Sequence, residues 1–499
     1  MYKLGIVGFG VVGKSVLAFL NKKNIEQTAE QNLYDESFAD RDITVRVWDM
    51  RALASEEQDI IKMYKASAVD PHSMGLEEFI KDNDFVVVSP GIDLHTHQNH
   101  QYKFLCELDF FSAFFTKPVV AVTGSLGKTT VTKLITKLAA AVPCVAHDTI
   151  IPALQVNEVS QLKTFMGGNV GIGMLDLVYQ QDAYDVGVLE LSSFQLELNR
   201  KFAPDIAVWT NWHANHLDRH KTPRDYFEAK LNVLRAQHDK QAAVVWHELL
   251  TGQTGPWFKE HLPEIKSLLC VCSERPYDQS FYTSLNRPLL YGFYCEGNNL
   301  VKMMLRQGAV AQTTPIFDLR VLPETTFLAN WIQVIATLDL MGIDLQQLNA
   351  LFEASPFVLE NNPHRLEYVA TINGVDFYDD SKSTVMQSTI AAFEKLSQKN
   401  RPIVLILGGL GKGVDRSPLV AHISSLPMLK KMYCFGKECS AFPGSVVYES
   451  LEKVMEDVST LVTSGDIVLF SPSGTSFDLF KDYKHRGRVF KALVNDLKK

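Results

Sequence analysis

The chain has 499 residues, of which 46% are hydrophobic and 21% are charged, and its formal net charge is −8 at pH 7. This composition is typical of a globular protein, and the length predicts about three domains. The negative charge argues against a general nucleic-acid-binding surface, and no apolar run approaches the ~18 residues that a membrane span requires. We therefore expect no nucleic-acid partner and no membrane span.

The N-terminal residues and the spacing of the cysteines both bear on the cellular compartment of the protein. The N-terminal residues enter a strand-like run at once, without the hydrophobic region and cleavage site of a signal peptide. The 7 cysteines are scattered and form no C-x-x-C pair. This spacing is typical of reduced thiols and not of a disulfide framework, so we expect a cytoplasmic protein.

Short apolar runs that end in glycine-containing turns recur along the chain. They lie at 4–7, 119–122, 402–407 and 467–470, and helical patterns follow the first two at 14–20 and 131–141. Such runs are typical of parallel α/β sheets, in which ligands bind at the carboxyl ends of the strands. The sequence thus predicts an α/β fold with three domains, at 1–116, 117–357 and 358–499.

The predicted domains are separated by turn-forming segments. Residues 116–118 mark the first boundary, and the segment from Pro356 to Pro363 marks the second. Residues 24–42 are polar and are expected to be a loop insertion, whereas residues 250–325 are rich in turns and give no assignable pattern. We expect a Rossmann-like first domain, a central domain resembling P-loop ATPases, and a Rossmann-like third domain.

The turn after the run 119–122 carries the strongest chemical signal. Its phosphate-loop residues are Gly124, Ser125, Gly127, Lys128, Thr129 and Thr130. Backbone N–H groups of such a turn, with the positive end of the following helix, cradle phosphate, while the Lys reaches the outer phosphates and the Thr binds Mg²⁺. The strict motif has Gly where Val122 stands, so a tight turn with an incidental Lys is the alternative.

The first glycine turn fits the dinucleotide fingerprint less specifically. It contains Gly8, Gly10 and Gly13, and Asp49 follows a second strand at 44–48. NAD binding, binding of another nucleotide diphosphate, and close helix–strand packing all remain open. Arg51, beside the acid, suits an additional phosphate or a uridine nucleotide.

Two further segments suggest metal binding. Glu190 ends the apolar strand 188–191, and an acid on a strand beside a phosphate loop can bind Mg²⁺, although an exposed strand-end Glu is the alternative. The segment 211–220 is rich in histidine. A zinc site of His213, His216 and His220 lacks a familiar spacing, and ordinary loop histidines are the alternative.

Several motifs together resemble the Mur ligase family of peptidoglycan synthesis. The most specific is Leu-Glu-Leu-Ser-Ser-Phe-Gln-Leu-Glu at 189–197. The others are 168–171, 215–219, 229–231, 363–365, 380–382, 408–412, 471–472 and 480–481. The resemblance covers nearly the whole chain except 24–42 and 250–325. It is strongest to members that add D-glutamate to UDP-N-acetylmuramoyl-L-alanine, with ATP and two Mg²⁺ ions as cofactors.

The resemblance implies a role for each matching residue. In the phosphate loop, Lys128 would grip ATP. One Mg²⁺ would be bound by Thr129 and Glu190, and a second by His216 and a carbamylated Lys230; Lys128, His216 and Lys230 would be catalytic. The other implied ATP contacts are Asn330, Arg365, Asp380 and Lys382. The implied contacts of the UDP substrate are Gly8, Gly10, Gly13, Asp49, Arg51, Ser89, Gly91 and Asn169. The implied contacts of D-glutamate are Thr384, Lys412, Ser476 and Tyr483.

The sequence departs from the family pattern at five positions. They are Leu126 and Leu410 in two glycine loops, Asn215 beside His216, Phe327 near the expected adenine site, and Tyr483 where Phe is usual. A lost polar contact costs about 1–3 kcal/mol if its partner stays buried and unpaired. Three other hypotheses stay open: a family member that adds a different amino acid, a degenerate nucleotide-binding regulatory protein, and an NAD-dependent oxidoreductase. We expect a monomer.

Overall fold

The computed structural model describes residues 2–22, 43–145, 161–171, 173–276, 278–323, 326–354 and 363–497. The chain divides into two compact units, which are Met1–Trp212 with Phe227–Phe357, and His213–Tyr226 with Val358–Lys499. Each unit is described by itself below. The expected insertion at 24–42 lies outside the described residues, and so does the boundary segment up to residue 362.

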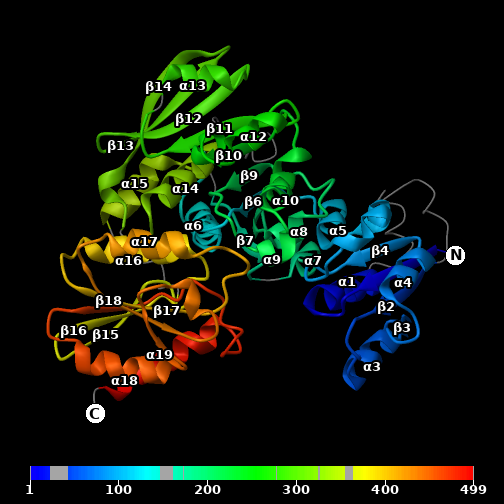
Figure 1. Ribbon diagram of the computed structural model, residues 1–499. Helices are drawn as coiled ribbons and strands as arrows, with labels where there is room; N and C mark the ends of the chain where they lie inside the picture. Colours follow the sequence, from blue (N-terminus) through cyan, green and yellow to red (C-terminus); the bar gives the residue numbers. More distant parts are fainter. Residues whose placement is uncertain are drawn as a thin grey trace. The chain divides into compact units, whose positions relative to one another are not determined.

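The first unit begins with a five-stranded parallel sheet in the order β3-β2-β1-β4-β5 (Figure 1). Its strands are β1 (Tyr2–Val7), β2 (Ile43–Trp48), β3 (Ser67–Val69), β4 (Phe85–Val88) and β5 (Phe104–Leu105). Its helices are α1 (Val11–Lys22), α3 (Ser55–Met63), α4 (Leu76–Asp82) and α5 (Glu107–Phe114). The strand order reverses between β1 and β4, and a crevice at such a reversal is where open α/β sheets bind ligands.

The first unit also contains a nine-stranded sheet in the order β14-β13-β12-β11-β10-β9-β6-β8-β7. Its strands are β6 (Val119–Thr123), β7 (Thr164–Gly168), β8 (Val186–Glu190), β9 (Ile206–Trp209), β10 (Ala242–Trp246), β11 (Leu268–Ser273), β12 (Leu289–Glu296), β13 (Asn299–Arg306) and β14 (Ala309–Asp318). Strands β6 to β12 run parallel, and β13 and β14 are antiparallel additions. The carboxyl ends of β6, β8 and β9 therefore meet at one edge.

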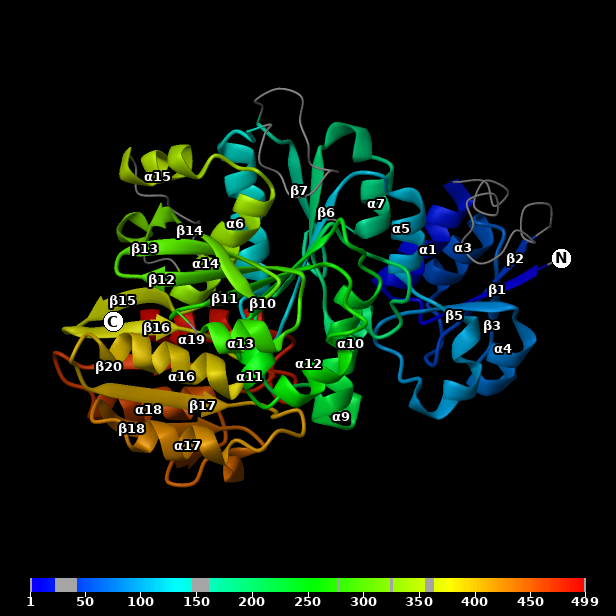
Figure 2. The same cartoon turned by 90° about the horizontal axis from the view of Figure 1, so that it is seen from above.

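Helices cover the central sheet, and α6 (Lys128–Ala141) packs against α14 (Leu328–Leu340), as Figure 2 shows. The other helices that begin within 173–354 are α7 (Met174–Val178), α8 (Ser193–Leu196), α9 (Leu217–His220), α10 (Pro223–Arg235), α11 (Glu248–Thr251), α12 (Gly255–His261), α13 (Gln279–Ser284) and α15 (Leu345–Ala354). Of these, α9 belongs to the second unit, and α10 begins in the second unit and continues into the first.

The region without an assignable pattern contains two tight hairpins. Glu296 pairs with Asn299, and Arg306 pairs with Ala309, so two residues form each turn. In the second turn, Gln307 and Gly308 have φ angles of 50° and 78°. Positive φ at both central residues is typical of a type I′ turn, whose twist matches that of the flanking strands.

The second unit contains a six-stranded sheet in the order β15-β16-β20-β17-β18-β19. Its strands are β15 (Glu367–Ile372), β16 (Val375–Asp379), β17 (Ile403–Gly408), β18 (Leu429–Phe435), β19 (Val446–Tyr448) and β20 (Ile467–Phe470). Figure 1 shows α16 (Met386–Ser397) and α17 (Ser417–Ser424) over one face and α18 (Leu451–Leu461) and α19 (Tyr483–Asp496) over the other. Because two hydrophobic cores bury both faces, β17 and β20 are continuous apolar runs.

Two local expectations differ from the structure. The helix after the phosphate loop begins at Lys128 and not at residue 131, because Gly127, with φ of 80°, turns the chain directly into the helix. The cysteines are not all free thiols, since Cys434 and Cys439 are joined in a disulfide. The sequence separation of these two cysteines is 5, outside the C-x-x-C spacing.

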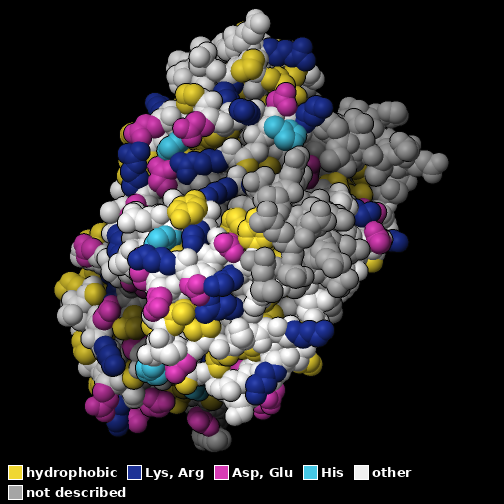
Figure 3. Space-filling model, turned by 90° about the vertical axis from the view of Figure 1, so that its right-hand side faces the viewer, with side chains coloured by type: hydrophobic (Ala, Val, Ile, Leu, Met, Phe, Trp, Pro, Cys, Tyr) yellow, Lys and Arg dark blue, Asp and Glu magenta, His cyan; other side chains and the backbone are white. Residues whose placement is uncertain are grey.

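No helix in the described ranges is both long and apolar enough to cross a membrane. On the face shown in Figure 3, Lys and Arg side chains are interspersed with Asp and Glu side chains among the residues drawn in colour.

Candidate active site

The phosphate loop connects a buried strand to a buried helix. All residues of β6 are buried, and Gly124 and Gly127 have φ angles of 143° and 80°. The Lys128 ammonium donates hydrogen bonds to the carbonyls of Gly124 at 2.9 Å and Ser125 at 3.2 Å. The loop therefore holds its own lysine at the N-terminus of α6, where backbone N–H groups and the helix dipole favour an anion.

The segment after β9 fixes the middle of this loop through the main chain. The Leu126 N–H donates to Asn211 Oδ1 at 2.8 Å, and the Leu126 carbonyl accepts hydrogen bonds from Asn211 Nδ2 and Thr210 Oγ1. These contacts do not involve the Leu126 side chain. The departure at Leu126 therefore leaves the loop's support in place.

Two buried ionisable residues lie behind the loop. Glu190, 2% exposed, ends β8, and its Oε1 accepts a hydrogen bond from Asn169 Nδ2 at 2.9 Å. Its Oε2 is buried without a hydrogen-bond partner among the described residues. Lys230, 1% exposed, lies on α10 and donates to the Gly124 carbonyl at 2.9 Å. Burial lowers the Lys230 pKa well below its usual range, and the Lys128 charge lowers it further.

Other residues of the predicted nucleotide site lie in α6 and α14. Thr129 and Thr130 are in the first turn of α6 and are both 7% exposed. A Cβ added at Gly127 would come within 2.5 Å of Asn330 Oδ1, so Asn330 lies directly against the loop. Phe327, at the start of α14, is 47% exposed.

The glycines at the carboxyl ends of β1 and β4 are required for different physical reasons. Gly8 has φ of 87°, and a Cβ at Gly13 would lie 2.2 Å from the Gly8 carbonyl oxygen, so these two serve the turn and the helix packing. Gly10 and Gly91 have no neighbouring atom within 4 Å of an added Cβ. Packing therefore explains Gly8 and Gly13, while Gly10 and Gly91 face open space that a ligand can approach.

Polar side chains join the carboxyl ends of β1, β2 and β4 in the five-stranded sheet. Ser89 Oγ donates to the Gly8 carbonyl at 2.7 Å, and Asp49 Oδ2 accepts from the Phe9 N–H at 2.7 Å. Arg51 forms two hydrogen bonds to Glu57, at 2.7 and 2.8 Å. Sequence reasoning missed Glu57, although its place in the first turn of α3 is visible as an acid at a helix start.

In the second unit, the segment 213–226 lies beside the glycine loop after β17. Lys412 Nζ donates to Asn215 Oδ1 at 3.3 Å and lies 3.5 Å from His216 Nε2. The Asp218 N–H donates to the Lys412 carbonyl at 3.2 Å. The structure therefore brings Lys412 and His216 together, and the amide of Asn215, one of the departures, accepts the Lys412 hydrogen bond.

The loops that carry Lys412 and Ser476 are joined by a short antiparallel bridge. The Leu410 N–H donates to the Thr475 carbonyl at 3.0 Å, and the Thr475 N–H donates to the Leu410 carbonyl at 2.8 Å. Ser476 is 2% exposed. Main-chain atoms hold Leu410 in this bridge, so its position does not depend on the polar side chain that it lacks.

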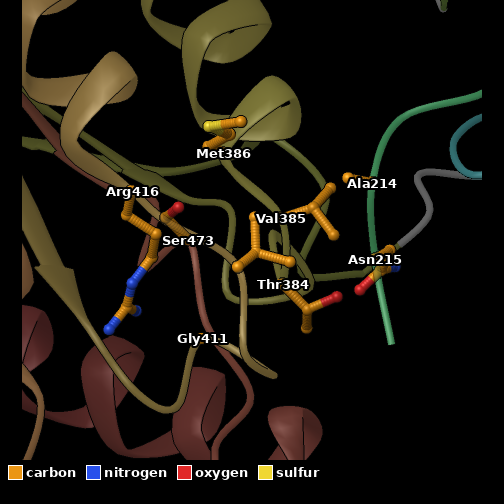
Figure 4. A pocket seen from close by; sticks show the side chains of 9 residues that line it. Ala214, Asn215, Thr384, Val385, Met386, Gly411, Arg416 and Ser473 are labelled. Atoms are coloured by element: carbon orange, nitrogen blue, oxygen red, sulfur yellow. The ribbon is translucent and has the colours of Figure 1, made fainter. Parts of the chain in front are cut away.

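A small pocket lies next to these loops, as Figure 4 shows. Its lining residues are Ala214, Asn215, Thr384, Val385, Met386, Gly411, Val414, Arg416 and Ser473. Thr384 is the predicted amino-acid contact that lines it directly. Sequence reasoning missed Arg416, because nothing in the local pattern distinguishes it from a helix-start residue.

Four other predicted site residues lie in the second unit. Lys382 Nζ lies 5.2 Å from the centre of the Tyr483 ring. Asp380 Oδ2 accepts from Ser471 Oγ at 2.7 Å, and Asp380 Oδ1 accepts from the Leu366 N–H at 3.0 Å. Burial raises the pKa of Asp380 to about 7. Arg365 is half-buried and precedes these residues on the turn into β15.

The alternative zinc site is not supported. Among the residues that the structure describes, the group whose ligand atoms come close enough for a metal is His364, Glu367 and Asp379. The ligand atoms of His213, His216 and His220 form no such group in those residues. Burial lowers the pKa of His213 to about 4, and the ring of His220 lies 5.4 Å from that of Tyr226.

Two protein-family models match segments of the chain that contain sites described above. The family model of the Mur ligase middle domain matches residues 122–260, and that of the Mur ligase, glutamate ligase domain matches residues 364–474. The solved structure of the MurF ligase from Thermotoga maritima in complex with ADP has a TM-score of 0.50 and 14% identity. It covers 91% of this chain and 94% of that chain, and this likeness shows the fold.

Curated relatives match along nearly the whole length. The chain is 30% identical over 505 residues to the UDP-N-acetylmuramoylalanine–D-glutamate ligase of Vibrio campbellii, a match that spans 99% of this chain and 98% of the relative. It is 29% identical over 508 residues to the enzyme of the same name from Geotalea uraniireducens, over 99% of this chain and 97% of that relative. An oxidoreductase does not account for this similarity, and the chain belongs to the Mur ligase family.

Proposed function

We propose that this chain is an ATP-dependent ligase that joins D-glutamate to UDP-N-acetylmuramoyl-L-alanine through an acyl phosphate. One observation carries the proposal: the phosphate loop with Lys128 meets the buried Glu190 and Lys230 at the carboxyl ends of neighbouring parallel strands. The names of the full-length relatives supply the substrates.

The residues around the phosphate loop fit ATP and Mg²⁺. The N-terminus of α6 offers N–H groups to phosphate, Lys128 offers a charge, and Asn330 lies against Gly127. Glu190 Oε2, which has no hydrogen-bond partner in the described part of the chain, and the Thr129 hydroxyl are oxygen ligands of the kind that Mg²⁺ prefers. Bound Mg²⁺ would offset the charge of the phosphates and of the attacking carboxylate.

Lys230 fits the carbamate that the resemblance implies. Its lowered pKa favours the neutral amine, whose lone pair can attack CO₂. The new N–C bond forms as the nitrogen loses a proton, and the product is an anionic oxygen ligand. We infer that Lys230 serves Mg²⁺ in this form, because a buried ammonium would repel the ion.

The first sheet fits the uridine nucleotide of the acceptor. Gly10 and Gly91 leave open space near the reversal between β1 and β4, and Arg51, whose guanidinium is hydrogen-bonded to Glu57, follows the neighbouring strand β2. The Asp49 carboxylate accepts hydrogen bonds from the backbone N–H groups of Phe9 and Arg51. We therefore propose that Asp49 stabilises the first glycine turn. Asn169 donates to Glu190, and we propose that it contacts the acceptor beside the metal site.

The second unit fits the incoming amino acid. Lys412 and the hydroxyl groups of Thr384 and Ser476 can bind the two carboxylates of D-glutamate. We propose that Tyr483 shapes the same site from a position beside Lys382, and that Arg365, Asp380 and Lys382 contact ATP. His216 lies 3.5 Å from Lys412 within this unit. A second Mg²⁺ on His216 stays an expectation of the sequence.

The reaction then has two steps. The acceptor carboxylate attacks the γ-phosphorus of ATP, ADP leaves, and Lys128 stabilises the charge on the transferring phosphoryl group. The D-glutamate amine next attacks the acyl carbon, loses a proton, and expels phosphate as the amide forms. This reaction belongs to peptidoglycan synthesis, and we propose a cytoplasmic monomer that supports cell-wall biogenesis, cell shape and cell division.

An amino-acid-dependent ADP-release assay with UDP-N-acetylmuramoyl-L-alanine tests the proposal. We expect D-glutamate to give a kcat/KM at least about 10²-fold higher than L-glutamate, L-alanine, L-lysine or meso-diaminopimelate, because buried polar partners discriminate on that scale. Equal turnover with another of these amino acids would favour a family member of different specificity. No ADP release with any of them would favour a degenerate regulatory protein.

A further inference from the structure

The loop that carries Lys412 is supported on two sides. On one side, Leu410 forms the main-chain bridge to Thr475 described above. On the other side lie Arg416, at the start of α17, and Glu438, which follows β18. Neither residue was expected from the sequence, and neither has a role in the function proposed so far.

Arg416 is a buried cation whose hydrogen-bond acceptors lie on Gly409 and Glu438. Its side chain is 2% exposed, and its guanidinium lies 4.4 Å from the ring centre of Phe442. Nη1 donates to the Gly409 carbonyl at 2.9 Å, and Nη2 donates to Glu438 Oε2 at 2.7 Å. A buried guanidinium loses much hydration, so these charge-assisted hydrogen bonds are needed to offset that cost.

Glu438 completes the support. Its Oε2 also accepts a hydrogen bond from the Gly411 N–H at 2.7 Å. The ion pair therefore binds a carbonyl before Leu410 and an N–H after it. A Cβ added at Gly411 would lie 2.9 Å from Arg416 Nε and 3.2 Å from Glu438 Oε2, so the loop packs directly against the pair.

The pair contacts the loop, and Arg416 also lines the pocket beside it. Arg416 and Gly411 line the same pocket as Thr384 and Asn215. Figure 4 shows the Arg416 side chain turned away from Thr384 and Asn215. Arg416 forms an ion pair with Glu438. The Lys412 ammonium instead contacts the segment that carries Asn215 and His216.

We propose that Arg416 and Glu438 are positioning residues of the amino-acid site. Their ion pair fixes the peptide groups on both sides of Leu410, and this sets the direction in which the next residues present the Lys412 ammonium. The inference rests on the proposed function, because it assigns to Lys412 the binding of the incoming amino acid.

Glu438→Gln is the first test, since Glu438 is partly exposed and its loss should leave the fold intact. The variant keeps the size of the side chain but removes the charge that holds Arg416 and Gly411. We expect KM for D-glutamate to rise about 10-fold, the scale of one charged hydrogen bond, while kcat and KM for ATP and for the acceptor change less than about 3-fold. Glu449→Gln, an exposed acid of the same unit, is the matched control.

A double-mutant cycle separates positioning from general stabilisation. In a Lys412→Ala background, Glu438→Gln should raise KM for D-glutamate no further, because both changes remove the same contact. Fully additive effects, equal rises in KM for all substrates, or unchanged kinetics would overturn the inference. Arg416→Lys keeps the charge but cannot bridge both acceptors, so it should reproduce the Glu438→Gln pattern, with thermal unfolding as the check on its fold.

The amino-acid preference of the wild-type protein tests the proposed function independently of the KM effects of the variants. If wild-type protein prefers a different amino acid, the specificity proposal fails, and the same KM comparison is made with the preferred amino acid. A selective and non-additive effect on that KM would still support the positioning role, and its absence would contradict it.

Discussion

Two glycine loops in this molecule look alike in sequence and differ in what supports them. Each follows a buried parallel strand and ends in a lysine, Lys128 after β6 and Lys412 after β17. Lys128 binds carbonyls of its own loop and begins a helix. Lys412 has φ of 55°, no helix begins at it, and its ammonium contacts a segment almost two hundred residues away in the sequence.

The difference shows how far a motif specifies its own geometry. A phosphate cradle is made of main-chain N–H groups and a helix N-terminus, which a few consecutive residues supply. A loop that recognises a carboxylate through one side chain needs neighbours to fix that side chain, and here they come from β18, α17 and residues 213–226. Substitutions in the first loop should therefore affect chemistry, and substitutions around the second should affect the binding of one substrate.

Lys128→Ala should have the largest effect. Loss of the charge that faces the transferring phosphoryl group should lower kcat at least about 10²-fold in the ADP-release assay, the usual scale for one preorganised electrostatic contact. The fold should survive, because the ammonium of Lys128 binds carbonyls of its own loop, whose shape is set by Gly124 and Gly127. Lys137→Ala, an exposed position further along α6, should retain activity. Folded Lys128→Ala protein with near-normal ADP release would remove the phosphate-loop assignment.

Lys230→Arg should be the next most damaging change. Arginine keeps a positive charge but cannot form the carbamate, so the variant should lose about 10–100-fold in activity at saturating Mg²⁺. Activity of the wild-type protein should depend on bicarbonate after CO₂ is removed from the buffer. Full activity of the arginine variant would show that Lys230 serves as a cation and that the carbamate is wrong.

Lys412→Ala sharpens the contrast with the first loop. We expect KM for D-glutamate to rise about 10-fold or more, since a charged contact to a carboxylate is lost, with acceptor binding almost unchanged. Lys399→Ala, an exposed lysine of the same unit, serves as the control in the same kinetics. A fall in kcat without a change in KM for D-glutamate would indicate that Lys412, like Lys128, acts in the chemical step and not in substrate binding.

Leu126→Asn should have the smallest effect. The main chain of Leu126 already binds Thr210 and Asn211, so the family's usual side chain should change kcat/KM less than about 3-fold. The free energy of unfolding should change by no more than about 0.5 kcal/mol, as for substitutions that remove no buried contact. A tenfold gain in kcat/KM would mean that the wild-type loop lacks a polar contact that it needs.

Much of the local structure followed from the sequence by itself. The run 467–470 is the strand Ile467–Phe470, and the first strand contains the predicted run 4–7, because buried parallel strands require unbroken apolar runs. The glycine turn after β6 leads into a helix as expected, although that helix begins at Lys128, three residues earlier than the pattern indicated. The α/β fold class is confirmed by the solved neighbour, and the family by the full-length relatives.

Only the tertiary structure decided which distant side chains meet. The buried Oε2 of Glu190, the lowered pKa of Lys230 and the ion pair of Arg416 with Glu438 depend on strand order, which brings residues together that no local pattern relates. The hairpins at 289–318 were missed because their turns carry Gly-Asn and Gln-Gly instead of a stronger signal. Sequence periodicity reports local conformation and burial, whereas pKa values and positioning contacts arise from the packing of segments far apart in the chain.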